Sequence, residues 1–211
     1  MFLEDIDRLS SRSWIPTDDD ILFARIRTVG IAEYNFELTL KSRLIHWRII
    51  DVGGTKSQRK AWVPYFEDSS AIIFLAPVSA YDQFLDEDPT KNRIDDSFQL
   101  FSSICTHPLL QRAHIVLFLN KTDVLRRKLR NGGVVRKFIS SYGDRPNRVE
   151  DVCQYFRYHF KQRFLESKPG KTRQLFPHYT SVVDTVAMRK MMGNVLQSVL
   201  TSHLAHAQVL D

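Results

Sequence analysis

Hydrophobic residues along the chain follow two patterns, short continuous runs and longer stretches with helical spacing. The continuous runs cover residues 71–76 and 114–119, and they are almost entirely apolar. Such runs are typical of strands buried on both faces of a parallel sheet. Two further strand-like runs, residues 36–40 and 44–50, flank Lys41-Ser42-Arg43. This arrangement predicts an antiparallel hairpin.

Helical spacing appears between and after these runs. Residues 93–105 and 149–164 each carry an apolar stripe at intervals of three and four. The stripes consist of Ile94, Phe98, Phe101 and Ile104, and of Val152, Phe156, Phe160 and Phe164. Residues 176–183 are a further strand candidate, and residues 186–204 are a final amphipathic helix. The alternation of strands and helices predicts an α/β, doubly wound fold with a mostly parallel sheet.

The length of the chain is sufficient for one sizeable core, and its positive charge suits an anionic partner. The chain has 211 residues, of which 43% are hydrophobic, and its net charge is +6. Residues 126–148 hold eight basic side chains and one acid, Asp144. This segment is either a solvated surface insertion or a contact for lipid headgroups or acidic partners.

The two cysteines, Cys105 and Cys153, lie in apolar helical patterns without the spacing of a metal site. We interpret them as reduced core thiols of a cytosolic protein. No apolar run reaches transmembrane length, and the second residue is not the glycine that myristoylation requires. We therefore expect peripheral membrane association through partners only.

Two motifs combine into a guanine-nucleotide site. Asp51-Val-Gly-Gly-Thr55 closes one apolar run, and Asn120-Lys-Thr-Asp123 closes another. A carboxylate at a strand end can hold Mg²⁺ through water, and paired glycines allow backbone N–H groups to approach a terminal phosphate. In the second motif, Asp123 accepts from two N–H donors on the edge of guanine that adenine does not offer.

With these elements placed, the chain resembles the alpha subunit of heterotrimeric G proteins over nearly its whole length. Residues 20–31 look like that family's linker and first switch, residues 51–67 like its second switch, and residues 81–93 like its third. The resemblance implies a Ras-like P-loop GTPase fold. It also implies that residues 1–24 are a remnant of the helical domain and linker, and that residues 25–211 are an incomplete Ras-like domain.

The resemblance implies roles for individual residues. Arg25 would stabilise charge on the transferring phosphate, which is the family's in-chain arginine in the general template for phosphoryl transfer. Thr28 and Asp51 would hold Mg²⁺, and the N–H of Val182 would contact the guanine carbonyl unless Val182 only ends a strand. The nucleotide site would comprise Leu22, Arg25, Thr28, Asp51, Gly53, Gly54, Asn120, Lys121, Asp123 and Val182. The surface for a beta-gamma dimer would comprise Arg59, Trp62 and Phe66, although Trp62 also fits simple core packing.

The chain departs from the family in two respects. Thr55 occupies the position of the catalytic glutamine that orients the attacking water, so slow GTP hydrolysis is expected. No Gly-x-x-x-x-Gly-Lys-Ser/Thr occurs, because Leu165 stands at the first glycine position of the sequence ending in Pro169-Gly-Lys-Thr172. We therefore expect the first, central strand and its P-loop to be missing. The chain is then either a fragment or a degenerate relative.

These features predict a guanine-nucleotide-binding signal transducer that switches between GTP and GDP with Mg²⁺ and hydrolyses GTP slowly. Expected partners are a beta-gamma dimer, a G-protein-coupled receptor that meets the C-terminus, and an unidentified effector. The expected location is the cytoplasm and the cytoplasmic face of the plasma membrane. The alternative is a degenerate pseudo-GTPase, an interaction module without nucleotide binding. Nucleic-acid binding through residues 126–148 is not expected, because no aromatic platform accompanies the charge.

Overall fold

The computed structural model describes residues 5–17, 20–21, 30–40, 43–170, 172–181 and 192–201. They belong to two compact units, residues 1–64 and residues 65–211. The division of the sequence at residues 24 and 25 into a helical-domain remnant and a Ras-like domain stays a prediction.

The first unit contains an antiparallel hairpin. Strand β1, Ile31–Leu40, pairs with strand β2, Arg43–Val52, over its whole length. The predicted hairpin is therefore confirmed, but β1 begins at Ile31 instead of Phe36. The extra length comes from the cross-strand pairing of Ile31 with Val52 and of Ala32 with Asp51, which local hydrophobicity does not reveal.

Before the hairpin, the first unit contains a short helix and a capped turn. Helix α1 spans Ile6–Leu9. Thr17 and Asp20 form a reciprocal cap, in which each side chain accepts from the other residue's backbone N–H, at 2.9 and 3.2 Å. Arg8 grips the Asp20 carboxylate with two N–H groups at 2.6 and 2.8 Å. The Arg8 guanidinium, with help from Thr17, holds the pKa of Asp20 well below its usual value.

The second unit contains a parallel sheet, as predicted. Its strands are β3, Ala71–Pro77, β4, His114–Asn120, and β5, Leu175–Tyr179, in the order β3-β4-β5. Leu119 pairs with both Ala76 and Tyr179. All three carboxyl ends therefore lie at the same edge of the sheet. Strand β5 ends at Tyr179, so Thr180 and Ser181 of the predicted run 176–183 are not in the strand, and residues 182 and 183 lie outside the described residues.

Burial separates the central strand from the edge strand. Every residue of β4 is buried, which confirms the prediction for residues 114–119. The prediction is wrong for β3, where Ile73 and Leu75 are 37% and 53% exposed. Phe74 points the other way and packs against the rings of Phe101 and Phe160. Because side chains alternate along a strand, Ile73 and Leu75 face away from the helices that cover Phe74.

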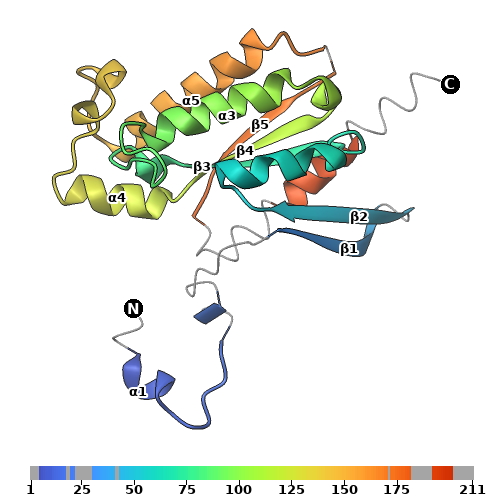
Figure 1. Ribbon diagram of the computed structural model, residues 1–211, viewed down its shortest axis with the longest axis horizontal. Coiled ribbons are helices and arrows are strands. Elements are labelled where there is room, and N and C mark those ends of the chain that lie inside the picture. Colours follow the sequence, from blue (N-terminus) through green and yellow to red (C-terminus); the bar gives the residue numbers. More distant parts are fainter. Residues whose placement is uncertain are drawn as a thin grey trace. The chain divides into compact units, whose positions relative to one another are not determined.

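Two helices, α3 (Arg93–Thr106) and α5 (Val149–Glu166), build the core on that covered face and lie side by side (Figure 1). All eight residues of the two predicted stripes are buried, which confirms both helices and their core faces. Phe160 is fully buried, and its ring lies 4.7 Å from that of Phe98 and 5.1 Å from that of Phe101. The cluster of aromatic rings is thus the centre of the second unit.

The second unit also contains both cysteines, which the sequence predicts to be core thiols. Both Cys105 and Cys153 are free and buried. Burial raises the pKa of Cys105 to about 12 and that of Cys153 to about 11, so both stay protonated at neutral pH. Arg173 is also buried and donates to the carbonyls of Cys105 and Ala113, at 2.6 and 2.9 Å. It thereby joins the end of α3 to the start of β4.

The remaining elements of the second unit are shorter. Helix α4, Thr122–Arg130, follows β4 directly. Residues 192–201 are helical with Val195 and Val199 buried, which confirms that part of the predicted final helix. The 3₁₀ helices are η2 (Val78–Ala80), η3 (Pro108–Leu110), η4 (Val135–Lys137) and η5 (Ser140–Tyr142), and η1 (Lys56–Tyr65) ends at the start of this unit. Within the described residues, no helix combines the length and the apolar character needed to cross a bilayer.

Candidate functional site

A tight turn joins β4 to α4 and carries the Asn-Lys-Thr-Asp motif. Asn120 ends the strand and is only 6% exposed, and its Oδ1 accepts from the N–H of Lys121 at 2.6 Å. Lys121 has a φ of 63°, a left-handed conformation that is uncommon outside glycine. Thr122 then opens α4, and Asp123 lies in its first turn with an exposed side chain. The turn thus presents a carboxylate from a strained, well-anchored backbone.

This turn is tied to the segment that follows β5. The N–H and the hydroxyl of Thr122 both donate to the carbonyl of Thr180, at 3.3 and 3.2 Å. The N–H of Thr180 donates to the carbonyl of Leu119 at 3.0 Å. The parallel pairing of β4 and β5 therefore continues past the strand ends. It brings the Asn120–Asp123 turn beside Thr180 and Ser181, which are far away in the sequence.

Two buried hydroxyls also lie at this place. Thr180 Oγ1 and Ser181 Oγ are buried and form no hydrogen bond within the part of the chain that the structure describes. A buried polar atom without a partner costs about 1–3 kcal/mol, so such atoms call for an explanation. A polar ligand bound beside the Asn120–Asp123 turn would explain them, because it could form hydrogen bonds with both hydroxyls.

The segment after β2 carries the other motif, in the first unit. Asp51 is the second-last residue of β2, where it pairs with Ala32, and its side chain is exposed. Gly53 is buried, and its N–H donates to the carbonyl of Gly30 at 3.2 Å. The indole N–H of Trp62 donates to the carbonyl of Gly53 at 3.0 Å. The glycine pair is therefore fixed from two sides, while Gly54 and Thr55 stay exposed.

Four of the predicted site residues lie outside the described residues: Leu22, Arg25, Thr28 and Val182. Of the predicted beta-gamma surface, Trp62 and Phe66 are 9% and 8% exposed. Phe66 packs edge-to-face on His107, with ring centroids 4.8 Å apart. The burial of Trp62 agrees with a role in core packing. Its role in binding a beta-gamma dimer stays a prediction.

The donor chemistry fits a magnesium ion that is shared with phosphates. Mg²⁺ usually binds through one or two carboxylates plus substrate phosphates and water. Asp51 offers such a carboxylate at an exposed position. Among the described residues, no group of three acidic, histidine or cysteine side chains comes together to form a metal site by itself.

The predicted third switch, residues 81–93, is anchored to α4. Lys128 Nζ donates to the carbonyl of Ser79 at 3.0 Å and forms an ion pair with Asp82. Asn92 caps α3 and donates from its amide to the carbonyl of Tyr81 at 2.7 Å. Helix α4 thus connects the Asn120–Asp123 turn to this segment through ordinary side-chain contacts.

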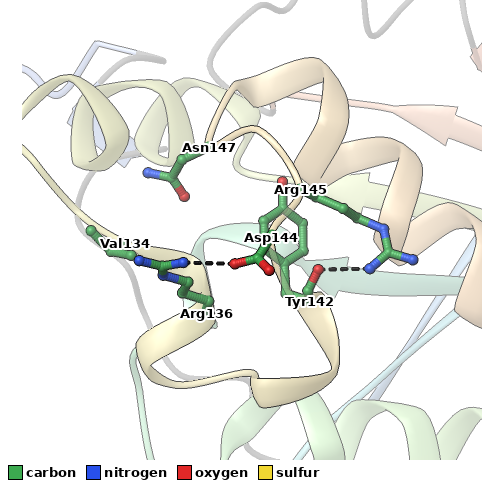
Figure 2. A pocket seen from close by; sticks show the side chains of 6 residues that line it. All are labelled: Val134, Arg136, Tyr142, Asp144, Arg145 and Asn147. Carbon is green, nitrogen blue, oxygen red and sulfur yellow. Dashed lines mark hydrogen bonds and ion pairs between the residues drawn. The ribbon is translucent and has the colours of Figure 1, made fainter.

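A separate small pocket lies in the basic segment, residues 126–148. Its volume is about 200 Å³, and its lining consists of Val134, Arg136, Tyr142, Asp144, Arg145 and Asn147 (Figure 2). Arg136 pairs with Asp144 at 2.8 Å, and Arg145 donates to the carbonyl of Tyr142 at 2.6 Å (Figure 2). Both guanidinium groups are therefore engaged within the segment, and none of the predicted nucleotide-binding residues lines this pocket.

Sequence reasoning missed the contacts that support the site. The roles of Thr122 and Thr180 as the link between the β4 and β5 ends depend on strand pairing, which no local pattern encodes. The contact between Trp62 and Gly53 joins residues that an unexpected 3₁₀ helix, Lys56–Tyr65, brings together. A signal was present for Thr180 alone, because it lies in the strand candidate 176–183, two residues before Val182.

Comparisons with known proteins agree with this arrangement. The family model described as G-protein alpha subunit matches residues 1–199. A guanine nucleotide-binding protein alpha-4 subunit from Mycosarcoma maydis is 41% identical over 210 residues, which cover 96% of this chain and 35% of that protein. A guanine nucleotide-binding protein subunit alpha-15 from Oryctolagus cuniculus is 36% identical, with 99% of this chain and 57% of that protein covered.

A third relative is the guanine nucleotide-binding protein G(o) subunit alpha of Geodia cydonium, which is 31% identical over 99% of this chain and 56% of that protein. The chain therefore spans 35% to 57% of the length of these relatives. The family implies a Ras-like GTPase fold, and the mixed α/β architecture with its parallel sheet agrees with it. This chain belongs to the G-protein alpha subunit family.

Proposed function

We propose that this chain binds guanine nucleotides as the switch of a heterotrimeric G protein. One observation carries the proposal: the Asn120–Asp123 turn is hydrogen-bonded to Thr180, beside two buried hydroxyls that lack partners in the described part of the chain. The names of the relatives, guanine nucleotide-binding proteins, support the same ligand.

Base selection rests on Asp123. An ionised carboxylate only accepts hydrogen bonds, so it pairs with the two N–H donors on the edge of guanine and not with the acceptor that adenine places there. Asn120 is buried, and its side-chain oxygen stabilises the turn by accepting a hydrogen bond from the N–H of Lys121. Val182 supplies a further N–H to the base, two residues after Thr180.

The phosphates and a magnesium ion belong, in this proposal, to Asp51, Gly53 and Gly54 together with Arg25 and Thr28. The ion supplies charge neutralisation for the phosphates when it is bound. Arg25 steadies negative charge that moves toward the leaving oxygen. Thr55 is shorter than glutamine and cannot hold water with both a donor and an acceptor, so hydrolysis is slow.

We further propose that the central strand and P-loop of the Ras-like fold are absent from these 211 residues. The sequence lacks the P-loop pattern. Among the described residues, β3 pairs on one side only, with β4, and it exposes Ile73 and Leu75 on the face away from α3 and α5. An unpaired strand edge is a natural place for a further strand, and the exposed apolar face of β3 shows that this side of the sheet lacks cover in the described residues.

The remaining parts of the proposal concern partners and location. Arg59, Trp62 and Phe66 meet a beta-gamma dimer when the second switch changes state, and residues 205–211 face a receptor. Attachment to the cytoplasmic face of the plasma membrane then arises through these partners. A pseudo-GTPase that keeps the partners and has lost the nucleotide is the competing function.

A competition titration tests the proposal. The 211-residue chain is titrated with a fluorescent GDP analogue in the presence of Mg²⁺, and bound analogue is displaced with unlabelled GDP or ADP. We expect saturable binding that GDP displaces and ADP does not. Absence of saturable binding in a cooperatively folded chain, or equal displacement by ADP, would instead favour the pseudo-GTPase.

A further inference from the structure

One side of helix α4 presents three arginines to solvent. Arg126, Arg127 and Arg130 are all exposed. Arg130 comes three and four residues after the other two, so the three side chains share one side of the helix, with Asp123 at its first turn. The opposite side of α4 faces the core, because Leu125 is fully buried. We call Arg126, Arg127 and Arg130 the arginine face.

The arginine face differs from most other cations of the basic segment. Lys128, Arg136 and Arg148 each form an ion pair with an aspartate, and Arg145 donates to a backbone carbonyl. The arginine face forms neither a hydrogen bond nor an ion pair with any residue that the structure describes. Three guanidinium groups on one helix side therefore keep their N–H donors for a further molecule.

The backbone that carries the arginine face is firmly held. On the other side of α4, Lys128 donates to the carbonyl of Ser79 at 3.0 Å and pairs with Asp82. Just after the helix, the N–H of Gly133 donates to the carbonyl of Lys128 at 2.9 Å, and a Cβ at Gly133 would collide with the hydroxyl of Tyr81. A helix fixed in this way loses little conformational entropy when its exposed side binds a partner.

The residue type and spacing of the arginine face indicate the chemistry of that partner. A guanidinium is a planar fork of N–H donors that matches a carboxylate through two parallel hydrogen bonds. Side chains one turn apart on a helix have Cβ atoms about 5–6 Å apart, and glutamates one turn apart on a second helix have the same spacing. Asp123 repels further acids at its end of α4. The carboxylates of a partner are thereby restricted to the part of α4 from Arg126 to Arg130.

Two other anionic surfaces fit α4 less well. A helix that lies on a membrane buries large apolar or aromatic side chains at the headgroup boundary, and single-stranded nucleic acids stack their bases on aromatic rings. The exposed residues of α4 are Asp123 and the arginine face alone, without any aromatic or large apolar side chain. Its exposed side therefore favours a partner that is recognised by charge and spacing.

We propose that the arginine face of α4 docks an acidic helix of a partner protein, whose carboxylates lie one turn apart. The inference goes beyond the proposed function, because neither the nucleotide nor the surface of Arg59, Trp62 and Phe66 takes part. The competing explanation is that basic residues in the last turn of a helix only stabilise its dipole. That explanation predicts no selective binding of an acidic helix.

The experiment measures binding of a labelled peptide of repeated Glu-Ala-Ala-Glu-Ala-Ala-Ala, in which the glutamates share one helix side. Fluorescence anisotropy is recorded with the whole chain at about 50 mM salt, where surface charges are only weakly screened. The same peptide with glutamine at every glutamate position is the peptide control. The test variant combines Arg126→Gln, Arg127→Gln and Arg130→Gln, because glutamine keeps a long side chain and a good helix propensity.

The matched control variant combines Arg112→Gln, Lys161→Gln and Lys168→Gln. These three side chains are exposed, and their replacement removes the same charge from the chain. Arg112 and Lys168 precede the amino ends of β4 and β5, whereas α4 follows the carboxyl end of β4. The control variant therefore changes the net charge away from the arginine face.

We expect saturable binding of the glutamate peptide and none of the glutamine peptide. The test variant should bind about 10-fold more weakly, because it loses three exposed ion pairs, and the control variant should bind almost as tightly as the unmodified chain. Higher salt should weaken binding by the unmodified chain. Circular dichroism should show that all three proteins are folded, and their affinities for GDP should be equal.

Three results would overturn the inference. Lack of binding of the glutamate peptide by the folded, unmodified chain would show that the arginine face recognises no acidic helix. Equal losses in the two variants would mean that net charge governs binding. If the unmodified chain ignores the peptide but binds vesicles of phosphatidylserine and phosphatidylcholine, and the test variant does not, the arginine face belongs to a lipid surface. None of these results depends on nucleotide binding, so a failure here is distinguishable from a failure of the proposed function.

Discussion

Replacement of Asp123 by asparagine should lower the affinity of the chain for GDP by about 100-fold or more. A hydrogen bond to a charged group contributes about 1.5–3 kcal/mol, and two such bonds to the guanine edge are lost. The amide of asparagine also points a donor at the donors of the base. Because about 1.4 kcal/mol corresponds to a tenfold change, even the lower estimate gives two orders of magnitude. Competition titration with fluorescent GDP measures the effect.

Asp144→Asn is the matched control for this variant. Its carboxylate is almost fully exposed and pairs with Arg136 in the basic segment. It removes the same charge from the chain without touching the Asn120–Asp123 turn. An equal loss of GDP affinity in both variants would mean that overall charge governs binding, and that Asp123 does not contact the base.

Replacement of Phe160 by alanine should destabilise the second unit by about 3–5 kcal/mol, the usual cost of removing a large aromatic side chain from a core. Phe160 is fully buried, and its ring touches those of Phe74, Phe98 and Phe101. These rings cannot all move to fill the cavity, because they come from a strand and a neighbouring helix. Urea denaturation followed by circular dichroism measures the change.

Phe138→Ala provides the comparison for this core variant. Phe138 is 43% exposed, although its ring also lies 6.0 Å from that of Tyr81. Its replacement should cost clearly less than that of Phe160. Equal losses for the two variants would show that α3 and α5 do not form the core of the second unit.

Regular periodicity made much of the second unit predictable. The stripes on α3 and α5 could be read from residues such as Phe98 and Phe156, because a helix that covers a sheet must place apolar residues three and four apart. The run of β4 was equally clear, since every residue of a central strand needs an apolar environment. These are local consequences of burial, and local patterns reveal them.

Features that depend on pairing between distant segments could not be predicted. The open face of β3 is one, because Ile73 and Leu75 look like core residues until the helices are placed on the opposite face. The link between Thr122 and Thr180 is another, since it depends on the parallel register of β4 and β5. Both features are determined by the neighbours of a residue in the folded structure and not by the residue's own hydrophobicity.

The candidate site shows the same division. Its motifs, Asn120–Asp123 and Asp51–Thr55, could be read directly, because their chemistry depends on residue type and order. The position of Gln58 over Gly53 could not, because it requires the chain to turn back on itself through η1.

Hydrogen–deuterium exchange with and without nucleotide tests most directly where the base binds. The amides of residues 119–123 and 179–181 should exchange more slowly when GDP and Mg²⁺ are added, and ADP should leave them unchanged. That result would place the guanine ring between the ends of β4 and β5. Unchanged exchange in both segments at saturating GDP, or protection confined to other parts of the chain, would contradict it.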